Sequence, residues 1–118
     1  MEVKLYGIPN CDSVRRARRW LDGNGIAYRF HDVRRDGLDN GRLAAWVERA
    51  GWETLLNRKG ATWRQLPPEK RKDIDARAAQ ALMLAQPTLI KRPVLEAGGH
   101  LEVGFDTGRY QSLFKGCQ

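Results

Sequence analysis

A single cysteine near the N-terminus carries the strongest chemical signal in the sequence. Cys11 follows an apolar stretch that ends at Gly7 and Pro9, and it precedes a run that contains Arg15 and Arg16. This order predicts that the cysteine stands at the start of a helix, where unpaired backbone N–H groups and the helix dipole stabilise a negative charge. Because the thiolate is the nucleophilic form of cysteine, we predict that Cys11 is a reactive, catalytic thiol.

Four neighbouring side chains are expected to adjust the pKa of this thiol. Asp12 and Ser13 suit the first turn of the helix, and Arg15 and Arg16 bring positive charge to the next turn. Positive charge lowers the pKa of a cysteine below its ordinary value of about 8.5, whereas the carboxylate of Asp12 opposes this effect. We therefore expect a modest depression.

The polar residues on both sides of the cysteine decide between two interpretations. A small cysteine that only packs inside a loop is the alternative to a reactive one. Asn10 and Asp12 flank Cys11 and disfavour its burial. Asn10 can also offer its side-chain amide to the sulfur or to a bound anion.

The spacing of the remaining cysteine and the two histidines does not indicate a second site. Cys117 is too far from Cys11 in sequence to suggest the disulfide framework of a secreted protein. We interpret it as a tail thiol, with a resolving thiol for Cys11 as the alternative. His31 and His100 are isolated and show no ligand spacing, so no metal site is predicted and both are interpreted as structural.

Size and charge limit the class of protein. The chain has 118 residues, 42% of them hydrophobic, which is enough for one domain with a core. Its N-terminus lacks signal-peptide features, and no apolar run approaches the ~20 residues that span a bilayer, so we expect a soluble, cytoplasmic protein without a membrane partner.

The net charge of +7 favours anionic partners, with a simply solvated basic surface as the alternative. Basic and acidic residues are mixed along the chain, which disfavours a nucleic-acid partner.

Apolar periodicity and turn residues predict the element order β-α-β-α, a helical insert, then β-β-α. Strands are predicted at 3–6, 27–33, 88–90, 94–95 and 101–103, with a hairpin turn at 98–99. Helices are predicted at 12–23, from Asp39 or Asn40 to Ala50, as short pieces across 52–87 with breaks at Gly60 and 67–68, and from Asp106 or Thr107 to Phe114. This order indicates an α/β protein.

Four segments, YGIPNC, LLNRKG, TLIKRPVL and VGF, resemble in this order the ArsC/Spx-like family, most closely its YffB-type members. The resemblance covers nearly the whole chain, taken as a single domain, 1–118. It implies an α/β, thioredoxin-like fold with a mixed four-stranded sheet and a helical insert between the βαβ and ββα halves. The thioredoxin-like core would comprise 1–37 and 88–118, and the insert about 38–87. In this family the N-terminal cysteine, here Cys11, is the reactive one.

The resemblance also implies which residues bind the substrate or glutathione. Arg58 and Arg92 would approach Cys11 and hold an oxyanion or a carboxylate, a task that suits the forked, permanently charged guanidinium. Pro93 would form a cis peptide bond and shape the floor of the site. Judged from the residues alone, Arg58 is instead a solvated turn residue, and Arg92 is either an exposed strand end or a ligand.

Two departures from family patterns bear on activity. Spx-type redox switches carry a second cysteine three residues after the first, where this chain has Val14, so a local Cys-x-x-Cys switch is excluded. Glutathione-coupled arsenate reductases of the family carry a third arginine after the hairpin, and the nearby candidate here is Arg109.

These features predict an enzyme of the oxidoreductase class. The leading hypothesis is a glutathione-dependent thiol-disulfide reductase that acts on a small anionic or disulfide substrate. It would hold no tightly bound cofactor, would use glutathione as co-substrate, and would have glutaredoxin or another protein as a further partner. One alternative is an arsenate reductase coupled to glutathione and glutaredoxin. A second alternative is an Spx-like regulator that binds RNA polymerase or another protein.

Overall fold

The computed structural model describes residues 1–115. The chain forms two compact units. Met1–Asp32 and the chain from Arg92 onward make one of them, and Val33–Lys91 makes the other. Within residues 1–115, none of the helices is both long enough and apolar enough to span a bilayer.

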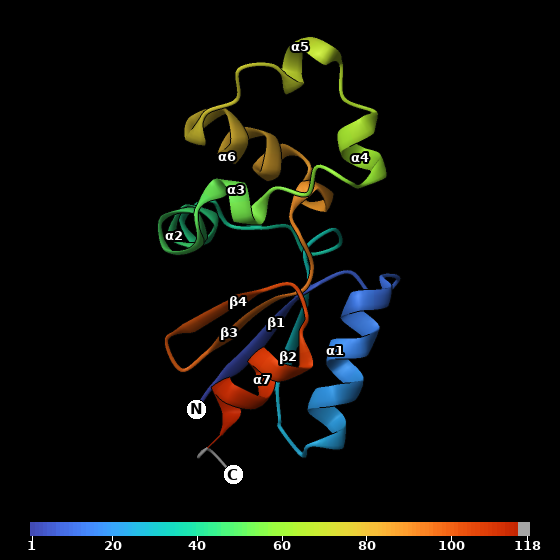
Figure 1. The fold of residues 1–118 in the computed structure, drawn as a ribbon, viewed down its shortest axis with the longest axis vertical. Helices are drawn as coiled ribbons and strands as arrows, with labels where there is room; N and C mark the ends of the chain where they lie inside the picture. The colour runs from blue at the N-terminus through green and yellow to red at the C-terminus, as the bar shows by residue number, and fades with distance from the viewer. Residues whose placement is uncertain (116–118) are drawn as a thin grey trace. The chain divides into compact units, whose positions relative to one another are not determined.

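The first unit, which we call the sheet unit, contains a mixed four-stranded sheet (Figure 1). Its elements are β1 (Val3–Gly7), α1 (Asp12–Gly23), β2 (Arg29–Asp32), β3 (Val94–Ala97), β4 (His100–Val103) and α7 (Thr107–Phe114). The strand order is β2-β1-β3-β4; β1 and β2 run parallel, and the other two pairs are antiparallel. The predicted α/β, thioredoxin-like fold with a mixed four-stranded sheet is thus confirmed.

One face of this sheet carries the core of the unit. Val3 and Leu5 alternate on β1 and pair across the strands with Ala97 and Leu95 of β3. α1 and α7 pack against these side chains. They contribute four buried residues, Ala17, Leu21, Tyr110 and Phe114. The apolar positions on α1 recur at the spacing of one helix face, which is why a sequence with so many arginines still buries one side of this helix.

Gly7 fixes how β1 passes into α1. A Cβ atom at this position would lie 2.6 Å from Cγ2 of Val14, a residue with no exposed surface. Glycine therefore allows the end of the strand to approach the first turn of the helix closely. This approach sets the short loop that carries Cys11.

The second unit, Val33–Lys91, is helical. Its elements are α2 (Asn40–Ala50), α3 (Trp52–Leu55), α4 (Ala61–Arg64), α5 (Pro68–Arg71), α6 (Ala76–Ala85) and the 3₁₀ helix Pro87–Leu89. Buried residues from most of these pieces form its interior: Leu43, Trp46, Leu55, Leu56, Leu66, Ala79, Met83 and Leu89. Gly60 and Pro67 fall between helices, as predicted for a segment of short pieces.

Two strand predictions need correction. The predicted strand at 88–90 is wrong, because Pro87–Leu89 forms a 3₁₀ helix closed by the Ile90 N–H, which donates to the Pro87 carbonyl at 3.0 Å. Proline has a fixed φ and no N–H to donate to a strand ladder, so it favours this turn of helix. Ile90 forms only an isolated bridge with Leu56. The strand predicted at 27–33 is shorter, Arg29–Asp32.

Candidate active site

Cys11 is the N-cap residue of α1. Its backbone is extended, with φ −127° and ψ 128°, and its carbonyl accepts the first helical hydrogen bond from the Arg15 N–H at 2.9 Å. The thiol is free and the residue is half-buried, so the sulfur is neither enclosed in the core nor fully exposed. The predicted position at a helix start is therefore observed.

The cap of α1 differs from the caps of α2, α6 and α7. Those three helices begin at Asp39, Asp75 and Asp106, and each carboxylate accepts a hydrogen bond from an N–H of the first turn, at 3.1, 2.8 and 2.8 Å. Cys11 makes no such side-chain hydrogen bond. The N-cap side chain of α1 therefore leaves the amides of the first turn available to an anion.

The strand register brings a second segment to the same edge of the sheet. Tyr6 of β1 pairs with Val94 of β3, so Arg92 and Pro93, which precede Val94, lie at the edge where β1 leads into the Cys11 loop. The Arg92–Pro93 peptide bond is cis, as expected. Pro93 is buried, and its carbonyl accepts a hydrogen bond from the Gly104 N–H at 2.8 Å, while Arg92 is half-buried.

The remaining predicted neighbours of the thiol lie on the loop and the first turns of α1. Asn10 is exposed in the turn before Cys11; Asp12 is exposed and Ser13 half-buried in the first turn. Arg15 and Arg16 are exposed, and the Arg16 guanidinium lies 5.4 Å from the centre of the Phe105 ring. The influence of these side chains on the ionisation of the thiol stays a prediction.

Arg58 belongs to the helical unit. It is exposed in the loop before α4, and its guanidinium lies 5.4 Å from the Trp52 ring centre and 5.8 Å from that of Trp63. These two aromatic rings restrain the side chain and leave N–H groups for a ligand. Its predicted role toward Cys11 stays a prediction.

Arg109, the candidate third arginine, is engaged in the sheet unit. Its Nε lies 3.6 Å from a carboxylate oxygen of Glu102 and 4.0 Å from one of Asp106, and it donates through a terminal nitrogen to the Val103 carbonyl at 3.2 Å. Two carboxylates therefore balance its charge. This arrangement favours a role in holding α7 to β4 over binding of an oxyanion.

The sequence analysis missed Asp32. It ends β2, pairs in register with Gly7 of β1, and is only 7% exposed. The carboxyl ends of parallel strands share one edge of a sheet, so this carboxylate lies at the edge that leads to Cys11. A charged residue near the end of the strand predicted at 27–33 was the signal that could have identified it.

His31 packs against an aromatic residue of the neighbouring strand. The His31 ring lies 5.1 Å from the ring of Tyr6, whose hydroxyl donates to Glu96 at 3.2 Å. Across residues 1–115, no group of three or more His, Cys, Asp or Glu side chains could hold a metal ion. Cys117 lies outside the described residues.

Known proteins resemble this chain in sequence and in fold. The ArsC family profile matches residues 6–113. The solved structure of a protein described as YffB is 47% identical, with a TM-score of 0.90 and coverage of 93% of this chain and 96% of that one. An arsenate reductase (ArsC) related protein from Brucella melitensis is 50% identical, with a TM-score of 0.77 and coverage of 98% and 96%. The global transcriptional regulator Spx of Listeria innocua is 27% identical, over 88% of this chain and 80% of the regulator. The chain belongs to the ArsC family.

Proposed function

We propose that the protein is a glutathione-dependent thiol-disulfide reductase with Cys11 as its single nucleophile. The observation that carries this proposal is the cap of α1, where a free, half-buried thiol stands in the place that aspartate takes in α2, α6 and α7. The local field at a helix N-terminus favours the anionic form of such a thiol. Membership of the ArsC family supports an oxidoreductase role.

The reaction has two exchange steps. The Cys11 thiolate attacks the glutathione sulfur of a mixed disulfide R–S–S–G, a Cys11–S–S–G bond forms, and R–S⁻ leaves and takes up a proton. The thiolate of a second glutathione then attacks the glutathione sulfur bound to Cys11. Oxidised glutathione leaves, and the Cys11 thiolate is restored. In total, the mixed disulfide is reduced and two glutathione moieties end as one disulfide.

The external thiol is needed because the chain has no local partner for Cys11. Val14 stands where a Cys-x-x-Cys motif would have its second cysteine, and its side chain is fully buried. In this proposal Arg92 binds a carboxylate of glutathione, Asn10 orients it, and Pro93 forms the floor beside the thiol. The reaction would take place in the reducing, glutathione-containing cytoplasm.

A coupled assay tests the proposal. Reduction of a glutathionylated peptide by glutathione is followed through formation of oxidised glutathione, and intact-protein mass spectrometry detects the Cys11–glutathione adduct. We expect activity in the wild type and in Cys117→Ser, and no activity or adduct in Cys11→Ser. Arg92→Gln and Arg58→Gln should each raise KM for glutathione. An active Cys11→Ser variant would refute the proposal.

An arsenate reductase is the first alternative, because a similar protein is described as arsenate reductase related. Its family pattern calls for a third anion-binding arginine, and Arg109 is already balanced by Glu102 and Asp106. Arsenate-dependent consumption of glutathione in the same assay, with glutaredoxin added, would favour this alternative.

A regulator is the second alternative, because the Spx protein of Listeria innocua is similar over most of this chain. This function would not need the thiol as a nucleophile. Binding of purified RNA polymerase to the wild type and to Cys11→Ser with equal affinity, together with no exchange activity, would favour it.

A further inference from the structure

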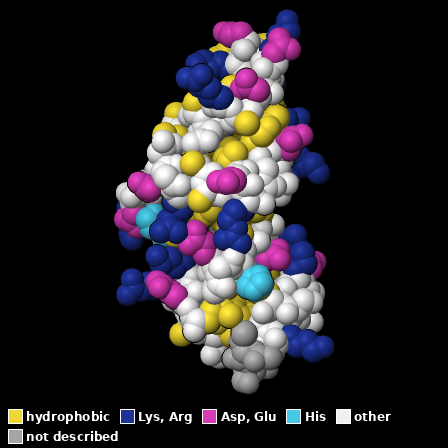
Figure 2. Space-filling view, turned by 90° about the vertical axis from the view of Figure 1, so that its left-hand side faces the viewer, with side chains coloured by type: hydrophobic (Ala, Val, Ile, Leu, Met, Phe, Trp, Pro, Cys, Tyr) yellow, Lys and Arg dark blue, Asp and Glu magenta, His cyan; other side chains and the backbone are white. Residues whose placement is uncertain are grey.

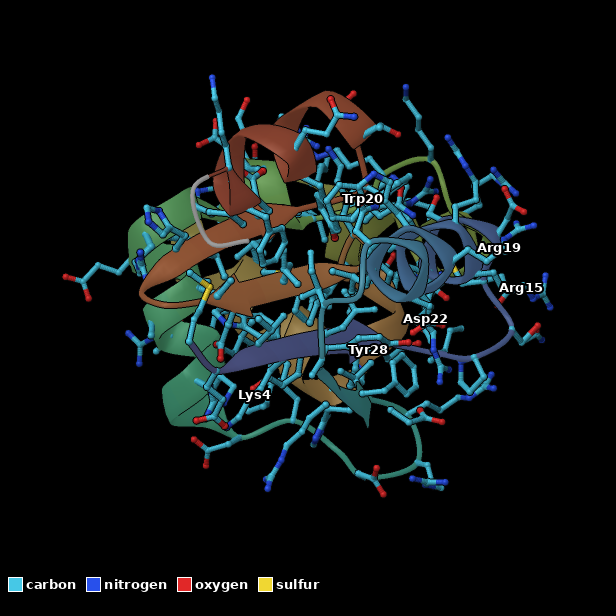
Figure 3. The ribbon with its side chains drawn as sticks, turned by 90° about the horizontal axis from the view of Figure 1, so that it is seen from below. Lys4, Arg15, Arg19, Trp20, Asp22 and Tyr28 are labelled. Atoms are coloured by element: carbon cyan, nitrogen blue, oxygen red, sulfur yellow. The ribbon has the colours of Figure 1, made fainter. Side chains whose placement is uncertain are left out.

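A row of charged side chains lies on the side of α1 that faces away from the core. Arg15, Arg18, Arg19 and Asp22 follow the spacing i, i+3, i+4 and i+7, which places them on one face of the helix. Figure 3 shows Arg15 and Arg19 projecting outward from α1, away from the sheet. Both residues are exposed, and neither guanidinium makes an ion pair or a hydrogen bond within residues 1–115. Arg15 and Arg19 therefore present two unpaired cations on this face of the helix.

Arg18 is held in place and forms the wall of a shallow groove. Its Nε donates to the Tyr28 hydroxyl at 3.1 Å, and its guanidinium stacks 4.3 Å from the centre of the Phe30 ring. The groove has a volume of about 460 Å³ and is lined by Arg18, Asp22, Ile26, Ala27, Tyr28 and Phe30. The row of arginines thus adjoins a partly apolar, preorganised recess.

We propose that this arginine face, Arg15, Arg18 and Arg19 with the adjoining groove, docks the protein that carries the mixed disulfide attacked by Cys11. The partner carries a short acidic segment with an apolar side chain that enters the groove. This inference rests on the proposed function, since it names the substrate class of the same thiol. Arg15 and Arg19 follow Cys11 by four and eight residues, about 6 and 12 Å along the helix. The partner's carboxylates should therefore lie at similar distances from its reacting cysteine.

Two features favour an acidic protein over a nucleic acid. Asp12 and Asp22 stand at the two ends of the row, ten residues apart, which is about 15 Å along the helix. A longer phosphate backbone would run onto these carboxylates, whereas a compact acidic segment fits between them. Arg and Tyr beside an apolar recess are also the side chains that anchor protein interfaces. On the face seen in Figure 2, which does not include α1, basic and acidic side chains lie interspersed.

The test compares three disulfide peptides in the Cys117→Ser protein. Each peptide has one cysteine blocked by 2-mercaptoethanol and one leucine, and the two residues beside them are Glu, Gln or Lys. The measurement is the second-order rate at which the Cys11 thiolate attacks the 2-mercaptoethanol sulfur of each peptide disulfide, so that the peptide thiol leaves and a Cys11–mercaptoethanol disulfide forms, at low and high salt. We expect the Glu peptide to react about tenfold faster than the Gln peptide at low salt, with the difference shrinking as salt screens the charges.

The variant Arg15→Gln/Arg19→Gln should reduce the Glu-to-Gln rate ratio to near one, and any change in the intrinsic reactivity of the thiol cancels in this ratio. Lys72→Gln/Arg77→Gln removes the same charge from exposed residues of the helical unit and should leave the ratio unchanged. A ratio near one in the wild type, with normal reaction of the Gln peptide, would overturn this inference alone. Failure of all three peptides to react, together with no reduction of the glutathionylated peptide in the coupled assay, would overturn the proposed function as well. Arginine-dependent binding of a single-stranded oligonucleotide, without a preference for the Glu peptide, would assign the face to nucleic acid and overturn the inference.

Discussion

Two helices of the sheet unit begin at the same edge of the sheet but have different N-caps. β1 and β4 both end at this edge, since Tyr6 pairs with Val94 and Val94 pairs with Val103. The helix after β4 begins at Asp106, whose carboxylate accepts a hydrogen bond from the Arg109 N–H at 2.8 Å. The helix after β1 begins at Cys11, which makes no side-chain cap. The carboxylate cap stabilises the N-terminus of α7, whereas the N-terminus of α1 carries a thiol and lacks this stabilisation.

Exchanging the cap residue should produce the largest effect. Cys11→Asp gives α1 the same cap residue as α7, so we expect exchange activity to fall at least about 1,000-fold because the nucleophile is lost. The same change should stabilise the fold by about 1 kcal/mol. The glutathione-coupled assay and urea unfolding measure the two effects. Loss of both activity and stability would show that the N-terminus of α1 does not accept an anion.

A side chain added at Gly7, next to the loop that carries Cys11, should have the next largest effect on stability and exchange. Gly7→Ala places a Cβ 2.6 Å from Val14, so we expect a loss of about 1–3 kcal/mol in the free energy of unfolding. The exchange rate should also fall, because the loop that carries the thiol shifts. Adding Val14→Ala removes the clash, so the double variant should be less destabilised than the sum of the two single changes. Simple additivity in urea unfolding would contradict this explanation.

Truncation of the two N-cap side chains, Asp106 and Cys11, to alanine should lower the free energy of unfolding by different amounts. Asp106→Ala removes a capping hydrogen bond and should lower the free energy of unfolding by about 1 kcal/mol. Cys11→Ala removes no such bond, so it should change the free energy of unfolding by only about a few tenths of 1 kcal/mol. It should also abolish exchange. Thermal unfolding of both variants at one pH provides the measurement. Equal losses would mean that Cys11 also has a structural role as a cap.

The smallest effect at neutral pH is expected inside α7. The Tyr110 hydroxyl is buried without a hydrogen-bond partner in residues 1–115, so Tyr110→Phe should be neutral or slightly stabilising at pH 7. Burial, aided by the charge of Glu102, raises the pKa of this hydroxyl far above its ordinary value of about 10. The unfolded chain releases this proton near pH 10 and the folded chain retains it, so stability falls as pH rises above about 10.

The pH dependence isolates this hydroxyl. Below about pH 10 the wild type and Tyr110→Phe should unfold at similar temperatures, and above it the wild type should lose stability faster, by up to about 1.4 kcal/mol per pH unit. Thermal unfolding from pH 8 to pH 11 provides the comparison. Parallel curves over the whole range would show that the hydroxyl is not buried as described.

Local signals in the sequence were sufficient for the part of the sheet unit that carries the thiol. Apolar spacing, Gly7 and the polar residues near Cys11 predicted the strand, the loop and the helix start. Features that depend on pairing across the chain were not predictable in this way. The position of Asp32 beside Gly7 follows from strand register, and the ion pairs of Arg109 follow from the packing of α7 on β4.

One prediction failed for a local reason. The apolar residues at 88–90 resemble a strand by composition, but Pro87 favours a 3₁₀ turn there. The absence of a side-chain cap at α1 was also beyond the sequence, because capping depends on the geometry of one side chain relative to the first-turn amides.

The most direct test of Cys11 as a reactive nucleophile compares its alkylation rate with that of a thiol placed away from a helix N-terminus. The two proteins compared are Cys117→Ser, with Cys11 as its single thiol, and Cys11→Ser/Cys117→Ser/Ser112→Cys, with its thiol at an exposed site near the end of α7. At pH 7 we expect iodoacetamide to react about tenfold faster with half-buried Cys11, because the helix N-terminus favours the thiolate. An equal or slower reaction at Cys11 would contradict the account.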